Sequence, residues 1–203
     1  MRQRKPAATR RREIADAALD IIADRGLPGF TSVAVARRVG LSDGALFRHF
    51  PTKRAIVGAV IERVEEELAA GQDADGGDAI ERLGAFFLQR AGVFAARPGV
   101  GRLVHSDDLA RAASPAGVAR VAAIRKRSQA FVRGCIDEAA REGLLADGLA
   151  PADAAALVFG AMSVLSRQSG GHADGAHPTA QGVWRALERT FRRAPLPPGG
   201  KIR

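Results

Sequence analysis

Residues 31–54 read TSVAVARRVGLSDGALFRHFPTKR, and this stretch decides which fold we expect for the chain. Its first half carries apolar residues at three-residue spacing, which is the pattern of a short helix with one buried face. Gly40 comes next, where a left-handed backbone lets one helix end and another begin nearby. The second half repeats helical spacing through Ala45, Leu46 and His49. A helix, a glycine-containing turn and a second short helix make up the helix-turn-helix motif.

The two short helices have caps and side chains that suit contact with DNA. Thr31 and Ser42 precede them, at positions where a hydroxyl accepts a hydrogen bond from a free backbone N–H. The second helix is sized to enter a major groove, and it opens with the small residues Gly44 and Ala45. Arg48 follows, and its two parallel donors match the O6 and N7 atoms of guanine. Periodicity alone fits an ordinary helical hairpin with a solvated basic end equally well.

The positive charge of the chain is concentrated around this motif. The 203 residues carry a net charge of +9, of which residues 1–54 contribute +7 and residues 55–203 contribute +2. A localised basic segment is typical of proteins that bind a polyanion. Six basic residues lie in the amino-terminal arm, residues 1–12. We expect this arm either to contact DNA phosphates or a minor groove, or to be a solvated tail.

The motif also matches a family signature. The run T-x-x-x-x-A-x-x-x-G-x-S-x-G-x-L-F-x-H-F-x-x-K, from Thr31 to Lys53, resembles that of the tetracycline-repressor (TetR/AcrR) family of bacterial transcriptional regulators. The resemblance is strong in the first third of the chain and extends to the rest only in helical layout and length. It implies a homodimer that binds double-stranded DNA at a palindromic operator. It also implies a body that can hold a small apolar or amphipathic ligand.

Residue by residue, the resemblance implies a set of DNA contacts. Phe47 stands where the family often has Tyr, so its ring can pack on a sugar but offers no hydroxyl to a phosphate. Val33 stands where some members have a polar base-contacting residue, which puts base readout from the first motif helix in doubt. Arg48 is the strongest candidate for reading a base. The expected DNA-contacting residues are Thr31, Ser32, Ser42, Asp43, Gly44, Ala45, Phe47, Arg48, His49 and Lys53.

Apolar periodicity predicts an all-α chain of about nine helices. Thr9 is the expected cap of a first helix that ends near Arg25, and a fourth helix over 53–70, capped by Thr52, follows the motif. Phe30 and Phe50 are expected to fill the small core of the head. We expect residues 1–54 to form a helix-turn-helix head with a basic arm, and residues 55–203 a helical regulatory and dimerisation body. The remaining helices are expected at about 79–96, 100–112, 115–142, 151–169 and 178–193.

The body is expected to hold the dimer interface and the ligand. Two amphipathic helices after a long one, at about 151–169 and 178–193, match the dimerising bundle of the family, and small residues in the first would let helix axes approach closely. Each aromatic residue of the body also fits simple core packing. The candidate ligand-binding residues are Phe86, Phe87, Phe94, Arg102, Leu103, His105, Phe131, Met162, Leu165 and Arg167.

Several other classes of protein fit poorly. The chain has no glycine-rich phosphate loop, HExxH or GxSxG motif, so we expect no enzyme and no cofactor or metal site. His172, Asp174 and His177 lie close together but lack regular ligand spacing. Cys135 is the single cysteine, which excludes an intrachain disulfide and suits the cytoplasm. No stretch approaches ~20 consecutive apolar residues, so we expect no membrane span.

Taken together, these patterns predict a cytoplasmic, nucleoid-associated regulator of transcription. The expected activity is repression from an operator, ended when a ligand binds the body. The alternative is a ligand-independent DNA-binding protein associated with the nucleoid or with cell division. The sequence leaves open which ligand, operator and genes are involved, and whether the protein represses or activates.

Overall fold

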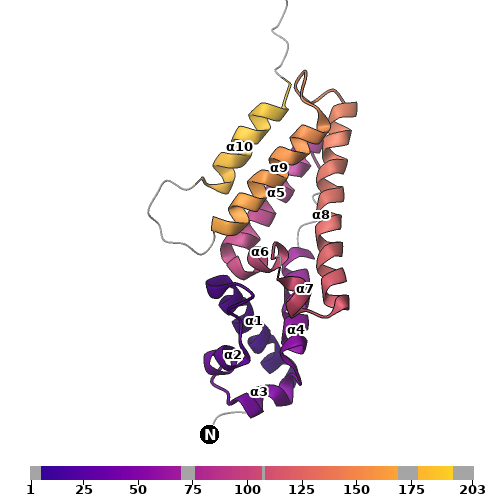
Figure 1. The fold of residues 1–203 in the computed structure, drawn as a ribbon. Helices are drawn as coiled ribbons and strands as arrows, with labels where there is room; N and C mark the ends of the chain where they lie inside the picture. Colours follow the sequence, from indigo (N-terminus) through magenta and orange to yellow (C-terminus); the bar gives the residue numbers. More distant parts are fainter. Residues whose placement is uncertain (1–5, 70–75, 107, 169–177, 194–203) are drawn as a thin grey trace, which may run out of the picture.

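The computed structural model describes residues 6–69, 76–106, 108–168 and 178–193 (Figure 1). These residues form ten α-helices and no strand, which confirms the all-α prediction. Three helices and the start of a fourth make a small head at one end, and the remaining helices make the body. In the described part of the chain, no helix has the length and apolar character needed to cross a membrane.

The head contains α1 (Ala7–Arg25), α2 (Ser32–Arg38) and α3 (Asp43–His49). Each of these helices has one apolar face, and the three faces meet in a shared core because none can be buried by its own helix. Phe30 and Phe50 lie at the ends of the connecting turns and are fully buried in this core. The prediction that both rings fill the head is therefore confirmed.

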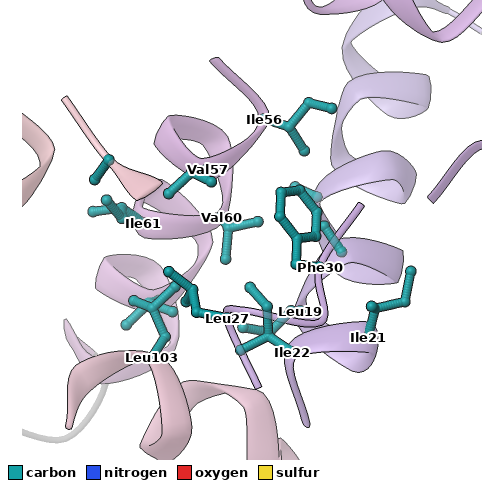
Figure 2. Close-up of a cluster of buried hydrophobic side chains, with 14 of the residues drawn as sticks. Leu19, Ile21, Ile22, Leu27, Phe30, Ile56, Val57, Val60, Ile61 and Leu103 are labelled. Atoms are coloured by element: carbon teal, nitrogen blue, oxygen red, sulfur yellow. The ribbon is translucent and has the colours of Figure 1, made fainter. Parts of the chain in front are cut away.

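The fourth helix, α4 (Lys53–Ala69), starts in the head and runs into the body (Figure 1). Thr52 caps it as predicted, since its Oγ1 accepts a hydrogen bond of 3.0 Å from the backbone N–H of Ala55. Its apolar side chains pack on α1 and are fully buried (Figure 2): Ile56, Val57, Val60 and Ile61. The apolar core thus continues past residue 54, and the division of the chain there stays a prediction.

The body is a bundle of α5 (Ala79–Ala96), α8 (Pro115–Arg141), α9 (Pro151–Gln168) and α10 (Ala180–Phe191) (Figure 1). These helices enclose a second apolar cluster, to which all four contribute. A capping box fixes the start of α5, because the side chain of Asp78 accepts from two backbone N–H groups of the first turn.

Trp184 marks the joint between α10 and α5. Its ring centroid lies 5.6 Å from that of Phe87 and 6.5 Å from that of Phe191. A Cβ atom on Gly84 would lie 2.5 Å from the Trp184 ring, so only glycine leaves room for the indole at this point of α5. The close approach of α10 to α5 therefore depends on one aromatic side chain seated over one glycine.

α6 (Pro98–Val104) is wedged between the head and the bundle. A Cβ atom on Gly99 would lie 2.1 Å from the carbonyl oxygen of Leu19 in α1. A Cβ atom on Gly101 would lie 2.8 Å from the carbonyl oxygen of Ser166 in α9. The absence of side chains at these two positions lets α6 touch the backbone of a head helix and of a bundle helix at once.

One helix of the body differs from the sequence prediction. The single helix expected at about 100–112 is wrong, because the chain forms α6 and then a separate short helix, α7 (Leu109–Ala112). Between them, the Oγ atom of Ser106 accepts a hydrogen bond of 3.2 Å from the backbone N–H of Asp108. A side chain that bonds a nearby backbone group in this way competes with helix formation.

Two predicted helix starts also need correction. Thr9 is not a cap, because α1 begins at Ala7 and Pro6 occupies the capping position without a side-chain bond. Ala is the strongest helix former, and two of them extend the helix past Thr9. α10 begins after Thr179, whose Oγ1 accepts a hydrogen bond of 3.0 Å from the N–H of Gly182. The loop that holds His172, Asp174 and His177, at which we expected no metal site, lies outside the described residues.

The close packing of α6 on α1 gives a testable prediction for stability. Replacing Gly99 with Ala forces a methyl group against backbone that cannot move aside, and we expect it to lower the free energy of unfolding by about 1–3 kcal/mol. The matched control is Gly92→Ala in α5, where an added Cβ meets no atom within 4 Å and should stabilise the helix by about 0.5–1 kcal/mol. Urea unfolding followed by circular dichroism measures both; equal effects would contradict the close approach of α6 to α1.

Candidate nucleic-acid interface and body cavity

The turn between α2 and α3 has the geometry that the sequence predicts. Thr31 Oγ1 accepts from the N–H of Ala34 at 3.2 Å, and Ser42 Oγ accepts from the N–H of Ala45 at 3.3 Å. Gly40 has a φ of +66°, so it supplies the left-handed residue that ends α2. Both predicted caps and the predicted turn residue are confirmed, and they fix α3 at a defined angle to α2.

One face of α3 is exposed. Asp43, Gly44, Phe47 and Arg48 are all solvent-accessible, whereas Leu46 points into the core with no exposed surface. A Cβ atom on Gly44 would meet nothing within 4 Å, so the helix surface there is open. The exposed face therefore combines small residues, one aromatic ring and one guanidinium, which is the composition that base-edge contact requires.

An exposed apolar residue from α2 lies in the same motif. Val33 is 52% exposed and Phe47 is 39% exposed, values that are unusual for large apolar side chains in the head. Thr31 is exposed at the start of α2, and Ser32 beside it is partly exposed. Backbone and hydroxyl donors at a helix start favour phosphate oxygens, and apolar groups favour sugars and thymine methyls.

Cations surround this face. The Lys53 ammonium lies 5.1 Å from the centroid of the Phe30 ring, and the Arg11 guanidinium lies 4.5 Å from that of Phe50. These cation–π contacts hold the charged ends of both side chains against rings of the head, although both residues remain exposed to solvent. His49, at the end of α3, is partly buried. The predicted DNA-contacting residues thus come from the start of α2, from the whole length of α3 and from the start of α4.

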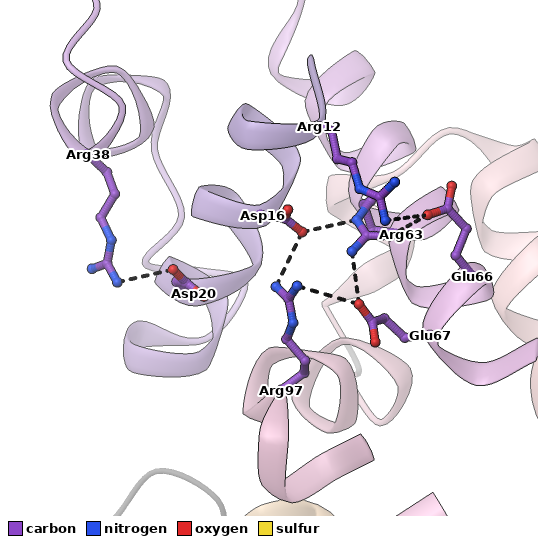
Figure 3. A network of polar contacts seen from close by, with 8 residues as sticks. All are labelled: Arg12, Asp16, Asp20, Arg38, Arg63, Glu66, Glu67 and Arg97. Carbon is purple, nitrogen blue, oxygen red and sulfur yellow. Dashed lines mark hydrogen bonds and ion pairs between the residues drawn. The ribbon is translucent and has the colours of Figure 1, made fainter. Parts of the chain in front are cut away.

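The orientation of α2 is tied to α1 by ion pairs. Arg38 lies 3.3 Å from Asp20 and 3.5 Å from Asp24, which are about one turn apart on α1 (Figure 3 shows the Asp20 pair). All three side chains are about half exposed, so we expect each pair to contribute less than about 1 kcal/mol. Their effect is to keep Arg38 turned toward α1.

A charge network joins the head to α6 (Figure 3). The guanidinium of Arg63 in α4 is 6% exposed; its Nε donates to Asp16 at 3.0 Å and its Nη2 to Glu67 at 2.9 Å. Arg97, directly before α6, lies 3.3 Å from Asp16 and 3.5 Å from Glu67. Burial would lower the pKa of Arg63, but hydrogen bonds with Asp16 and Glu66 raise it above its ordinary value. Arg63 and Arg97 therefore both pair with Asp16 of α1 and with Glu67 of α4.

The body contains a cavity of about 430 Å³ between α4, α5, α8 and α9. Of the residues that we expected to bind a ligand, Phe94, His105 and Met162 line it. Desolvation of the ring lowers the pKa of His105, and the charges of Arg125 and Arg167 lower it further, so the ring is neutral at pH 7. The complete lining is Leu68, Arg90, Phe94, Val104, His105, Ile124, Arg125, Ser128, Gln129, Val132, Phe159, Met162 and Ser163.

The other candidate ligand residues lie elsewhere. Arg102, His105 and Arg167 line a separate, more open hollow beside the end of α1. The rings of Phe86 and Phe131 pack on each other with centroids 4.7 Å apart. The remaining candidates are buried in the two apolar clusters: Phe87, Leu103 and Leu165. The structure therefore brings three of the ten candidates together at the cavity, and their role in binding stays a prediction.

Arg90 also lines the cavity, and its position in the sequence is a signal for a functional residue. In α5 the apolar stripe runs through Leu83, Phe87 and Phe94, and position 90 falls on that stripe. An arginine on the buried face of an amphipathic helix is unusual, because a charge almost never goes unpaired inside a protein. Arg125, on α8, belongs to a run of three basic residues, 125–127, yet its Nε is buried at the cavity.

Two comparisons decide the family of the chain. The profile of the "Bacterial regulatory proteins, tetR family" matches residues 14–60, which cover α1 to the first half of α4. Over 146 residues the chain is 30% identical to the nucleoid occlusion factor SlmA of Marinomonas sp. (strain MWYL1), a match that covers 70% of this chain and 72% of that protein. The chain belongs to the TetR family.

Other relatives extend this result with less coverage. A nucleoid occlusion factor SlmA from Vibrio atlanticus (strain LGP32) is 34% identical over 107 residues, and the match covers 50% of this TetR-family chain. That match spans only 54% of the relative's length, and for the SlmA of Haemophilus ducreyi (strain 35000HP / ATCC 700724) it spans 34%. About half or less of these relatives is therefore matched.

Solved structures show the same TetR-family fold over nearly the whole chain. The ketosteroid transcriptional regulator KstR2 of Mycobacterium tuberculosis superposes with a TM-score of 0.76, covering 95% of this chain and 98% of the other at 18% identity. AibR, solved in complex with isovaleryl coenzyme A and operator DNA, superposes with a TM-score of 0.71 over 88% of this chain and 96% of the other at 19% identity. The fold therefore extends through the body, where the sequence signature ends.

Proposed function

We propose that this TetR-family chain is a dimeric, sequence-specific transcriptional regulator that represses from a palindromic operator and leaves it when a small molecule binds the body. The observation that carries the proposal is the exposed face of α3, with Gly44 open to solvent and Arg48 accessible beside it. We assign DNA binding to residues 1–54, and pairing and regulation to residues 55–203. Selection of bound duplexes from a random pool tests it, with a palindrome as the expected result.

The charge distribution supports DNA as the partner of the head. Residues 1–54 carry a balance of +7, and Lys53, Arg54 and Arg48 are exposed around α3. Cations that neutralise phosphates release counterions, so affinity for DNA should fall steeply as salt is raised. The exposed Val33 and Phe47 add apolar surface that sugar and thymine methyl groups could cover.

An apolar stripe on α9 supports a homodimer. Among the described residues, the large apolar side chains that stay exposed outside the head are Leu157 at 45% and Val164 at 46%. They are seven residues apart, so they lie on one side of α9, with Gly160 and Ala161 between them. A second copy packed there, with α10 alongside, would cover the stripe and set two α3 helices about 34 Å apart.

The cavity supports regulation by a ligand. Its volume of about 430 Å³ is within the usual range for small-molecule sites. AibR, whose fold this chain shares, was solved with both an acyl coenzyme A and operator DNA. A ligand acts only if it prefers one arrangement of the two heads, because equal affinity for both arrangements shifts no population.

The second candidate function is a nucleoid-associated protein that needs no ligand. It is favoured by the sequence relatives, which are nucleoid occlusion factors. The two candidates share the DNA-binding head and the dimer, and differ in the number of sites and in the use of the cavity. Chromatin immunoprecipitation separates them: many dispersed sites favour the nucleoid protein, and one or a few promoter sites favour the repressor.

Arg48→Ala should weaken binding to the selected duplex by about 1–3 kcal/mol and relax the sequence preference at one position. The reason is the loss of two parallel donors to a guanine edge. Fluorescence anisotropy with the selected duplex and with single-base variants measures both effects. Arg133→Ala, at an exposed site on α8, is the control and should change neither. Unchanged affinity in Arg48→Ala would contradict the docking of α3 in the groove.

Lys53→Ala should weaken binding to all duplexes by similar factors. A lysine that contacts phosphate carries no sequence information, and its loss should reduce the slope of log affinity against log salt by about one unit. Titrations at four or more salt concentrations, on selected and on random duplex, give the slopes. A slope that stays the same would remove Lys53 from the phosphate contacts.

Leu157→Glu should convert the dimer to a monomer, because it puts a charge on the apolar stripe of α9. Ala123→Glu, which adds the same charge to an exposed face of α8, is the control and should leave the dimer intact. Light scattering at micromolar concentration measures the mass. If both variants and the wild type are monomers, the chain does not pair through α9.

A further inference from the structure

Arg90 is a buried cation with no counter-charge in the part of the chain that the structure describes. Its side chain is 2% exposed, and it is the largest of the fully buried side chains in the described part of the chain. None of its guanidinium nitrogens, Nε, Nη1 and Nη2, has a hydrogen-bond partner among the described residues. Its contact on one side is the Phe86 ring, whose centroid lies 4.9 Å from Cζ. The other side of Arg90 borders the cavity.

This arrangement is costly for the empty protein. A cation–π contact recovers only part of the hydration that a guanidinium loses on burial, and an unpaired charge in an apolar interior costs several kcal/mol. Burial lowers the pKa of Arg90 to about 10, so the side chain stays charged at pH 7. Arg90 therefore does not lower the desolvation cost by losing its proton. A bound anion would offset that cost.

The rest of the cavity wall has the character of a site for an amphipathic anion. Arg125 adds a second cation, and its Nε is also buried without a hydrogen-bond partner among the described residues. Ser128, Gln129 and Ser163 line the wall as neutral polar groups, and none of the lining residues carries a carboxylate. Apart from His105, the remaining wall is apolar: Leu68, Phe94, Val104, Ile124, Val132, Phe159 and Met162.

We propose that the cavity binds a small amphipathic carboxylate, whose carboxylate pairs with the guanidinium of Arg90 and whose apolar tail lies against the wall formed by Phe94, Phe159 and Met162. The planar fork of arginine matches a carboxylate with two parallel hydrogen bonds. The ligand assignment rests on the proposed function for its regulatory meaning, and it adds the chemical class of the ligand. The binding step itself involves the body alone and needs no DNA.

The wall elements connect this site to the head. Leu68 lies on α4, the helix that starts at Lys53, and Val104 ends α6, the helix wedged on α1. A carboxylate paired with Arg90 would draw α5 and α8 toward the bound negative charge. α5 packs on α6, and α8 packs on α4. Occupation of the cavity would thus favour one placement of α4 and α6, and with it one spacing of the heads.

The test is calorimetric titration of the full-length protein at pH 7, without DNA, using octanoate and octan-1-ol. The two probes have the same tail and differ in the charged head. We expect octanoate to bind roughly 10- to 100-fold more tightly, the factor that one charge-assisted pair confers. Octyl phosphate is a third probe; if it binds more tightly than octanoate, the site is built for phosphate and the carboxylate assignment is wrong.

Arg90→Met keeps an unbranched apolar stem and removes the charge. It should reduce octanoate affinity to that of octan-1-ol, leave octan-1-ol unchanged, and raise the melting temperature of the ligand-free protein because the unpaired cation is gone. Arg133→Met, at the exposed site on α8, should change none of these. Arg90→Lys keeps a charge without the fork, so it should retain a weaker preference for octanoate.

Three further results would overturn the inference. Equal affinity of the wild type for octanoate and octan-1-ol would mean that the cavity is merely apolar. Undiminished selectivity in Arg90→Met would remove Arg90 from the site. A fall in the melting temperature of Arg90→Met would mean that Arg90 already has a partner. The titration contains no DNA, so the two proposals can fail separately. A protein that binds specific DNA but not octanoate contradicts this inference alone. A protein that binds octanoate but not DNA contradicts the proposed function alone.

Discussion

The packing of α1 on α4 and α6 is the constraint on which the rest of the structure depends. α1 buries its apolar face against α4, and α6 approaches so closely that Gly99 has no room for a side chain beside Leu19. The head is therefore not a separate module joined by a linker. Its position is set by the same helices that enclose the body, and any change in them reaches the head directly.

The charges at this junction reinforce the constraint. Arg63 and Arg97 share Asp16 and Glu67, so α1, α4 and the start of α6 meet in one network. Arg63 is buried, and moving it away from its carboxylates would leave a charge without a partner. Such a network resists gradual deformation and favours a small number of discrete arrangements, which is what a switch between head spacings needs.

The head could be read from the sequence because its signals are local. Thr31, Gly40 and Ser42 act within three or four residues of their own positions, and each has the role that its residue type predicts. The buried Phe30 and Phe50 follow from apolar periodicity in the same way. The break between α6 and α7 was missed, because it depends on a Ser106 side-chain bond that competes with an otherwise acceptable helical pattern.

The cavity was only partly predictable, because its members come from distant parts of the chain. Phe94, His105 and Met162 were selected as candidates for their type, but Phe86 and Phe87 looked equally suitable and are core residues. The presence of aromatic residues does not distinguish the wall of a cavity from a packed core, because both are apolar and both are built from helices. A charge on an apolar stripe is a more specific signal, and Arg90 carries it.

The seat of Trp184 over Gly84 has a practical consequence. Trp184 is the only tryptophan of the chain, and the chain has no tyrosine, so one indole dominates its near-ultraviolet absorption and emission. That indole reports on the joint between α5 and α10, far from α3 and outside the lining of the cavity. Intrinsic fluorescence would therefore follow the opening of the bundle itself, undisturbed by direct quenching from a bound duplex.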